Sequence, residues 1–252
     1  MPDGVASGGG TIRNNAGAEI TGGAFDGTGI EAHGILIDAS NGGDAVAATT
    51  IFNSGLIRGY TGYAGKIVGT YSNAVTNNVG GTIRGAGALS VGAAIQTGDG
   101  NDTVTNYGAI RGDNGAAIDL QGGDDMLFIP GGSASIIGDI AGGAGSNMLV
   151  VDPGTGNNFS YDGVISNFAV EARSGKTTFA GSETVASLTI SGGAVVTLGG
   201  TMPANDNGFF PPGEERLSAR DGALDRSVPE PMIPCLITFG VATLLKSRPK
   251  RP

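Results

Sequence analysis

The chain has 252 residues and a net charge of −9, with 48 glycines, no tryptophan and only 15% charged residues. This composition excludes a core built on large aromatic side chains, whereas 39% hydrophobic residues exclude a chain that is disordered throughout. Up to residue 210 there are 18 acidic and 7 basic side chains, and we expect no nucleic-acid partner because phosphate binding needs a basic footprint. The single cysteine, Cys235, excludes an internal disulfide and a metal site made of several cysteines.

The N-terminal residues 1–11 are small and polar, and we predict that they are disordered. They contain no basic segment followed by an apolar one, so no signal peptide is visible in this chain. The first apolar residue of the repetitive region follows at Ile12.

From residue 12 to residue 202, short β-type runs recur and are separated by Gly and Asn. Asn53, Asn77 and Asn106 end three similar runs, at spacings of about 24–29 residues. Three further ladders have spacings of about 22–27 residues: isoleucines before Arg-Gly, isoleucines after Gly-Ala-Ala, and glycines before two polar residues. Their members are Ile57, Ile83 and Ile110; Ile95 and Ile118; and Gly100, Gly123 and Gly145.

This periodicity predicts an all-β fold, a single-stranded parallel β-helix with three short strands in each coil of about 22–29 residues. Each strand would pair with its counterpart one coil away at about 4.8 Å. Several coils must stack, because no coil buries its inner face alone. A leucine-rich repeat is the competing solenoid, and it needs a fixed leucine skeleton that this chain lacks.

Two segments after residue 152 depart from this pattern. Residues 187–191 and 194–198 alternate around Gly192-Gly193, which predicts either a hairpin or the last coils. Residues 203–228 are polar, charged and contain several prolines, and we predict a flexible linker there.

The C-terminal segment, residues 229–252 with the preceding valine, combines three features in one order. The motif Val228-Pro229-Glu230-Pro231 precedes an apolar stretch, Met232 to Leu245, for which we predict a short helix with a membrane role. A basic tail follows, and we expect it to stay on the cytoplasmic side. The tail consists of Lys246, Arg248, Lys250 and Arg251.

This order resembles the PEP-CTERM sorting signal of Gram-negative bacteria, in which an exosortase recognises the Pro-Glu-Pro motif. The resemblance covers residues 228–252 and implies export, anchoring in the inner membrane before processing, and an exosortase as partner. Proteins of this family also carry an N-terminal signal peptide. We therefore expect that the true start lies upstream of Met1 or that the chain is a fragment of a larger adhesin.

The repetitive body, residues 12–200, resembles the β-helical passengers of autotransporter adhesins, with their Asn-x-Gly-x-Ile-x-Gly coils. The resemblance implies a location in the cell envelope, on its extracellular or periplasmic side. It also implies exopolysaccharide or surface glycans as partners. No translocator β-barrel follows the body in this chain, so we do not expect secretion by that route.

Four aspartates, Asp99, Asp102, Asp124 and Asp125, form the candidate metal site. Residues 98–104 resemble one nonapeptide of the RTX calcium-binding β-roll, and residues 122–127 repeat part of it. Calcium takes six to eight oxygen ligands, which stacked aspartate turns would supply. The two copies lie one coil apart instead of following each other directly, so polar turns between strands are the alternative. We expect no other cofactor.

A carbohydrate-active enzyme would need carboxylates on an exposed sheet face. Asp119, together with Asp124 and Asp125, is the cluster that would provide them, and a glycosidase pair needs a defined separation. No histidine or group of basic residues accompanies this cluster in the sequence. We therefore expect no catalytic residues and keep a polysaccharide lyase or hydrolase as the alternative.

Three other features have both a functional and a structural interpretation. His33, the single histidine, has no nucleophile pattern nearby and is expected to be structural. Arg58, Arg84 and Arg111 recur at one register, which predicts a solvated face or an anion site. Cys235 lies in the apolar stretch, where lipidation and an inert buried thiol are the two interpretations.

Together these features predict a non-enzymatic, exported β-helix protein of the cell envelope, with a structural or adhesin-like role. Its C-terminal segment would anchor it and be processed by an exosortase.

Overall fold

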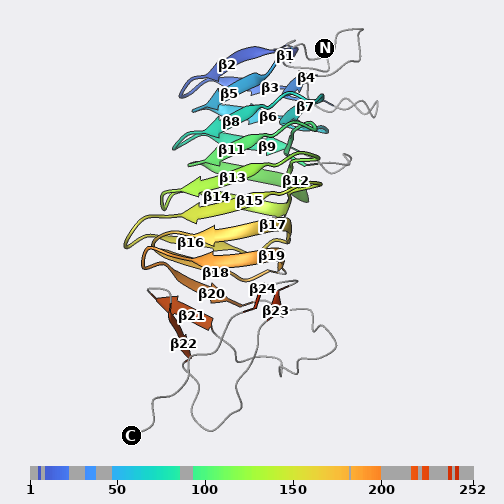
Figure 1. Cartoon of the computed structure of the whole chain (residues 1–252). Helices are drawn as coiled ribbons and strands as arrows, with labels where there is room; N and C mark the ends of the chain where they lie inside the picture. The colour runs from blue at the N-terminus through green and yellow to red at the C-terminus, as the bar shows by residue number, and fades with distance from the viewer. Residues whose placement is uncertain are drawn as a thin grey trace, which may run out of the picture.

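The computed structural model is an elongated rod of stacked short strands that runs from the N-terminal to the C-terminal end of the body (Figure 1). The body consists of parallel strand pairs, and no helix occurs among the described residues. The predicted all-β class and parallel pairing are thereby confirmed. The structure describes residues 5–6, 9–22, 32–37, 47–85, 93–181, 183–199, 217–220, 223–226, 238–239 and 242–243.

The strands form three columns that run along the rod, which we call columns A, B and C in the order in which each coil visits them. Column A comprises β2 (Gly10–Asn14), β5 (Thr49–Asn53), β8 (Ala74–Asn77), β11 (Thr103–Asn106), β13 (Met126–Pro130), β15 (Met148–Asp152) and the second halves of β17 (Ile165–Ala172) and β19 (Glu183–Ile190). Column B comprises β3 (Glu19–Thr21), β6 (Leu56–Arg58), β9 (Thr82–Gly85) and the first halves of β12 (Ala109–Asp119) and β14 (Ser135–Ala141).

Three later strands take the column B place in the chain order and form a separate parallel sheet: β16 (Asn158–Tyr161), β18 (Lys176–Phe179) and β20 (Val195–Leu198). Column C comprises β1 (Val5–Ala6), β4 (Ile35–Ile37), β7 (Gly65–Ile67), β10 (Ile95–Gln96), the second halves of β12 and β14, and the first halves of β17 and β19.

Equivalent residues of successive coils pair in register. Asn14 pairs with Asn53, and Asn53 pairs with Asn77, so one residue type recurs at each level. Counted between equivalent residues, successive coils contain 39, 24, 29, 23 and 22 residues. Ala169 pairs with Ser187, so the coil between these two residues is shorter still. The predicted coil length thus holds for the middle coils, while the first coil is longer and the last is shorter. This arrangement is consistent with a parallel β-helix.

The core is a set of apolar rows, one on the inner side of each column. Alternate residues of β5 are buried and half-buried, as expected for a strand with one face in the core. Each fully buried Ile, Leu or Val contributes about 1.5–3 kcal/mol relative to an exposed one. The rows are Ile51, Val75, Val104, Leu127 and Leu149 in column A, Ile57, Ile83, Ile110 and Ile136 in column B, and Ile35, Ile95, Ile118, Ile140 and Ile165 in column C.

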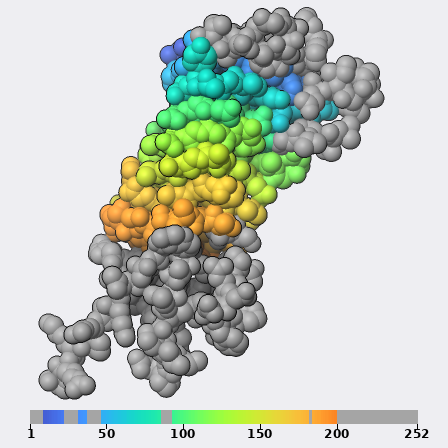
Figure 2. Space-filling model, turned by 45° about the vertical axis from the view of Figure 1, so that its right-hand side comes forward, coloured from blue at the N-terminus to red at the C-terminus, as the bar shows by residue number. Residues whose placement is uncertain are grey.

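One position interrupts the column C row. Gly65 pairs with Ile35 on one side and with Ile95 on the other, so a glycine stands where the neighbouring coils have isoleucine. An internal cavity lies beside it, and its other lining residues are all Ile or Val. On the outside, the coloured coils in Figure 2 form contiguous bands without a deep hollow on that face.

The strand pairing bears on two sequence predictions about the ends of the body. Residues 1–11 were predicted to be disordered, but β1 pairs with β4, and β2 already begins at Gly10. The two runs around Gly192-Gly193 do not form a hairpin. They lie in β19 and β20, which pair in parallel with β17 and β18 and so belong to the last coils. The reason is that apolar inner faces become buried by stacking on the preceding coil.

Short strands also occur where a linker and a helix were predicted. Within 203–228 the structure places an antiparallel pair, β21 (Leu217–Arg220) and β22 (Ala223–Arg226). The sequence between them is Asp-Gly, the dipeptide typical of a two-residue hairpin turn. Within Met232 to Leu245, β23 (Thr238–Phe239) and β24 (Ala242–Thr243) are strands, so a helix is wrong for these four residues, which include β-branched and aromatic types.

Candidate functional site

Two ladders of buried polar side chains flank column A, one at each end of its strands. The asparagine ladder occupies the last residue of four strands and consists of Asn14, Asn53, Asn77 and Asn106. Along it, each Nδ2 donates to Oδ1 of the next asparagine at 2.8–2.9 Å. Each Nδ2 also donates to a backbone carbonyl of the next coil at 3.0–3.1 Å. Because the coils stack in register, each buried amide of the ladder finds hydrogen-bond partners in the next coil, and the role of the ladder is structural.

The second ladder precedes the strands of column A, and we call it the mixed ladder. It consists of Thr49, Asn73, Asp102, Asp125 and Asn147. Here a backbone N–H of one coil donates to the side-chain Oδ1 of the next coil at 2.6–3.0 Å. Two members are carboxylates, which have no N–H to donate. Oδ2 of Asp102 and Oδ2 of Asp125 are buried without a hydrogen-bond partner among the described residues.

The two carboxyls of the mixed ladder have raised pKa values. Burial raises the pKa of Asp125 to about 6, against the opposing hydrogen bond from the backbone of Asp102 and with help from the charges of Asp102 and Asp124. Burial also raises the pKa of Asp102, although hydrogen bonds from Asn73 oppose it. Neutral asparagine fills the same ladder position at Asn73 and Asn147, so the fold itself tolerates a neutral side chain there.

The four aspartates of the predicted calcium site are divided between the interior and the surface. Asp102 and Asp125 are buried in the mixed ladder, whereas Asp99 and Asp124 are exposed. Oδ1 of Asp124 accepts the backbone N–H of Ser146 at 2.8 Å, and its own N–H donates to Asn101. Within the part of the chain that the structure describes, no three His, Cys, Asp or Glu side chains gather as metal ligands would. Calcium binding stays a prediction.

The predicted register of three arginines is found on the outer side of column B, and we call Arg58, Arg84 and Arg111 the arginine row. Arg58 pairs with Arg84, and Arg84 pairs with Arg111. Nε of Arg84 and Nε of Arg111 each donate to a different oxygen of Asp113 at 2.7 Å. Although burial acts in the opposite direction, these hydrogen bonds hold the pKa of Asp113 below its usual value.

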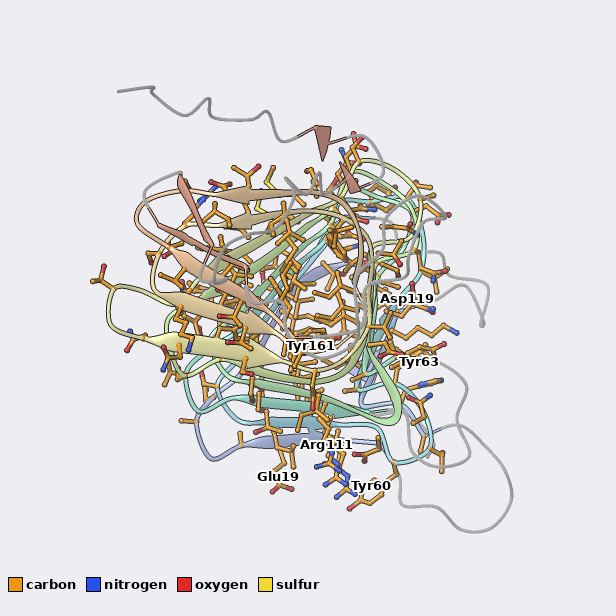
Figure 3. The ribbon with its side chains drawn as sticks, turned by 90° about the horizontal axis from the view of Figure 1, so that it is seen from below. Glu19, Tyr60, Tyr63, Arg111, Asp119 and Tyr161 are labelled. Carbon is orange, nitrogen blue, oxygen red and sulfur yellow. The ribbon has the colours of Figure 1, made fainter. Side chains whose placement is uncertain are left out.

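The first member of the arginine row has a different partner. The guanidinium of Arg58 lies 3.8 Å from the ring centroid of Tyr60, which is 36% exposed. Figure 3, a view along the rod, places Tyr60, Arg111 and Glu19 at one edge of the coil and Asp119 and Tyr63 on another side. The row is therefore separated from Asp119, the carboxylate considered for catalysis.

Asp119, the carboxylate considered for catalysis, faces outward on column C. It pairs with Gln96, and its Oδ2 accepts hydrogen bonds from Nε2 of Gln96 at 3.3 Å and Nε2 of Gln121 at 2.5 Å. Asp125 is buried on the mixed ladder, and Asp124 is exposed at the turn before column A. Each of these carboxylates therefore has a different set of partners.

His33 is buried and has a structural environment. Its Nδ1 accepts the backbone N–H of Tyr63 at 3.0 Å, and the two rings lie 5.5 Å apart. Gly62 packs closely against the imidazole, since a Cβ there would collide with it. This agrees with the structural role predicted for His33.

The predicted sorting motif Val228-Pro229-Glu230-Pro231 and the basic tail lie outside the described residues, and so does Cys235. Of the predicted membrane segment, only the four residues of β23 and β24 are described. The described residues include no helix with the length and apolar character needed to cross a membrane.

Two features of this surface and core were not found from the sequence. Asp113 and Tyr60 complete the arginine row, and each stands two residues after its row arginine, Arg111 and Arg58, but the two residue types differ and so formed no visible repeat. The mixed ladder was partly visible as glycine followed by two polar residues, yet the sequence did not separate its buried second polar residue from the exposed first one.

No protein-family model, no curated protein and no solved structure matches this chain.

Proposed function

We propose that this chain is an exported, non-enzymatic β-helix protein of the cell envelope with a structural or adhesin-like role. The proposed fold is a single-stranded parallel β-helix, supported by three columns of parallel strands paired coil to coil. In this proposal the C-terminal segment, residues 228–252, is a PEP-CTERM-type signal that holds the protein at the inner membrane until an exosortase processes it.

The observation that carries the proposal is that the buried polar side chains of the two ladders connect neighbouring coils of the body. The buried side chains of the asparagine ladder and the mixed ladder form hydrogen bonds from one coil to the next. The cavity beside Gly65 is internal and apolar, so it offers no group for chemistry. Such a rod supports a role as a rigid spacer with long outer faces, because each coil repeats the same surface positions.

The sorting part of the proposal is tested in a Gram-negative host that has an exosortase. Deletion of residues 232–252 is expected to move the protein out of the membrane fraction. Glu230→Ala is expected to leave the unprocessed form at the membrane, and Glu215→Ala in the predicted linker is the matched control. Unchanged fractionation of the deletion variant and unchanged processing of Glu230→Ala would contradict an anchor that is read by an exosortase.

The alternative is a polysaccharide lyase or hydrolase that uses Asp119. As a hydrolase, it requires two carboxylates at a defined separation across a bound sugar. The test is release of reducing or unsaturated ends from a panel of neutral and acidic polysaccharides. We expect no release by the intact protein, whereas release that is lost in Asp119→Ala and kept in Asp162→Ala would replace the structural proposal with the enzymatic one.

A further inference from the structure

The arginine row has positive charge that the described residues do not neutralise. Asp113 is the ion-pair partner of both Arg84 and Arg111, and Arg58 has an aromatic partner instead of an acidic one. Within the described part of the chain the three cations thus have one ion-paired carboxylate among them, while the exposed Glu19 lies at the same edge of the coil (Figure 3). Like charges at directly paired positions of neighbouring strands destabilise a sheet, so the row has no evident stabilising purpose.

The ends of the guanidinium groups are open for binding. Arg84 and Arg111 use Nε for Asp113, and no hydrogen bond from their Nη amines is found in the described part of the chain. Their side chains are 37% and 50% exposed. A guanidinium fork binds a carboxylate or another oxyanion with two parallel hydrogen bonds, which a lysine cannot do.

The spacing of the row restricts the ligand. Neighbouring strands lie about 4.8 Å apart, so the three cations form a line along the rod with that repeat. This repeat is close to the length of one sugar residue in a polysaccharide. The exposed ring of Tyr60 next to Arg58 adds an aromatic surface on which a sugar ring can pack.

The row is also limited in length. At the next coil on either side, the paired positions are Thr21 and Ile137, neither of which is charged. Duplex DNA has a phosphate charge every ~1.7 Å along its axis, which is a much denser array than a row of three cations can match. A polymer with one charge per residue fits the row better.

We propose that the arginine row binds an acidic polysaccharide, with successive carboxylates of the polymer on Arg58, Arg84 and Arg111 and a sugar ring on Tyr60. This inference rests on the proposed adhesin-like function and names its partner class. Because the whole chain has a net charge of −9, the binding depends on charges within about 8–10 Å and weakens as salt is added.

The test uses the full-length protein and polygalacturonate as probe, with dextran as the neutral polymer and single-stranded DNA as the competing polyanion. Binding is measured by calorimetry at low and at physiological ionic strength. The wild type is expected to bind polygalacturonate in a salt-dependent manner and not to bind dextran. The triple variant Arg58→Gln, Arg84→Gln, Arg111→Gln is expected to lose at least about tenfold in affinity, since one charge-assisted hydrogen bond contributes that much.

Three further variants distinguish loss of specific binding by the arginine row from unfolding and from a general loss of positive charge. Asp113→Asn removes the competing carboxylate and is expected to raise the affinity. Replacement of the three arginines by lysine keeps the charge but loses the forks, and an intermediate affinity is expected. Arg13→Gln is the matched control, because Arg13 makes the same kind of contact with Phe52 on column A, 4.3 Å from the ring centroid, and its loss is expected to leave binding unchanged.

The proposal is overturned if the glutamine triple variant binds as the wild type does, or if the folded wild type does not bind polygalacturonate at low ionic strength. It is also overturned if DNA binds as tightly as polygalacturonate, since the row would then be a general polyanion site. None of these outcomes affects the proposed envelope function, which fails instead on fractionation of the Met232–Pro252 deletion or on polysaccharide cleavage.

Discussion

The two polar ladders that flank column A solve the same problem with different chemistry. In the asparagine ladder each side chain is both donor and acceptor, so every level satisfies the next one. In the mixed ladder Asp102 and Asp125 only accept when ionised, and each retains a buried oxygen without a partner among the described residues. The comparison indicates that one ladder supports the rod at every pH, whereas the other is sensitive to protonation.

The largest effect is expected from breaking the asparagine ladder at its centre. Asn77→Ala removes the acceptor of Asn53 and the donor to Asn106 and Ala109, leaving buried polar groups unpaired. We expect a loss of about 3 kcal/mol in the free energy of unfolding, measured by urea denaturation. The control is Asn78→Ala, whose Nδ2 bonds Ser54 in a partly buried position, with a loss below about 1 kcal/mol. Equal losses in the two variants would contradict the ladder's role.

The second prediction concerns the pH dependence of the mixed ladder. The pKa of Asp125 is about 6 in the folded state and about 3.9 in an unfolded chain, so the folded state binds more protons between these values. Stability therefore falls as pH rises through this window, by about 2 kcal/mol from this group. Urea denaturation at pH 4.5 and pH 7.5 measures the difference. Asp113 acts in the opposite sense at lower pH, because its folded pKa is lowered and its contribution is lost as pH falls.

Replacing the carboxylate with the amide found at neighbouring levels tests the cause of this pH dependence. Asp125→Asn keeps the acceptor for the Asp102 backbone N–H and removes the buried charge. We expect a gain of about 1–2 kcal/mol at pH 7.5 and a flatter profile between pH 4 and pH 6. Asp124→Asn, at the exposed neighbouring position, is the control. A destabilised Asp125→Asn with an unchanged profile would show that the charge has another partner.

Filling the cavity beside Gly65 changes apolar packing, so its effect on the free energy of unfolding can be compared with the effects of the ladder variants. A Cβ at Gly65 would contact no atom within 4 Å, and its paired neighbours are Ile35 and Ile95. Gly65→Ala is expected to raise the free energy of unfolding by about 1 kcal/mol, through methyl burial and lower entropy of the unfolded chain. Gly85→Ala is the contrasting variant, because a Cβ there would collide with Ala64, and it should destabilise.

The smallest effect is expected from calcium. Asp102 and Asp125 are buried in the mixed ladder, whereas Asp99 and Asp124 are exposed, so the four carboxylates do not converge on one ion. We expect the melting temperature to stay the same when calcium is titrated, with magnesium as the control. A rise specific to calcium that disappears in Asp125→Asn would restore the predicted metal site.

Much of the body was predictable because its repeats keep the same residue types. The spacing of Asn53, Asn77 and Asn106 predicted levels that do pair in the structure. The same holds for Ile57, Ile83 and Ile110. The length of the first coil was missed because 39 residues separate Asn14 from Asn53, and the last coils were left open against a hairpin because they become shorter. A pattern read at a constant period does not detect such changes.

The sequence by itself determined the all-β class, the parallel ladders and the register of the arginine row, since these follow from which residue types recur at similar spacings. Only the tertiary structure decided which aspartates are buried, because Asp124 and Asp125 are adjacent in sequence and yet one is exposed and the other is in the core. It also brought Asp113 between Arg84 and Arg111 and placed Tyr60 against Arg58. Those contacts depend on the path that the chain takes after each column B strand, which local sequence does not encode.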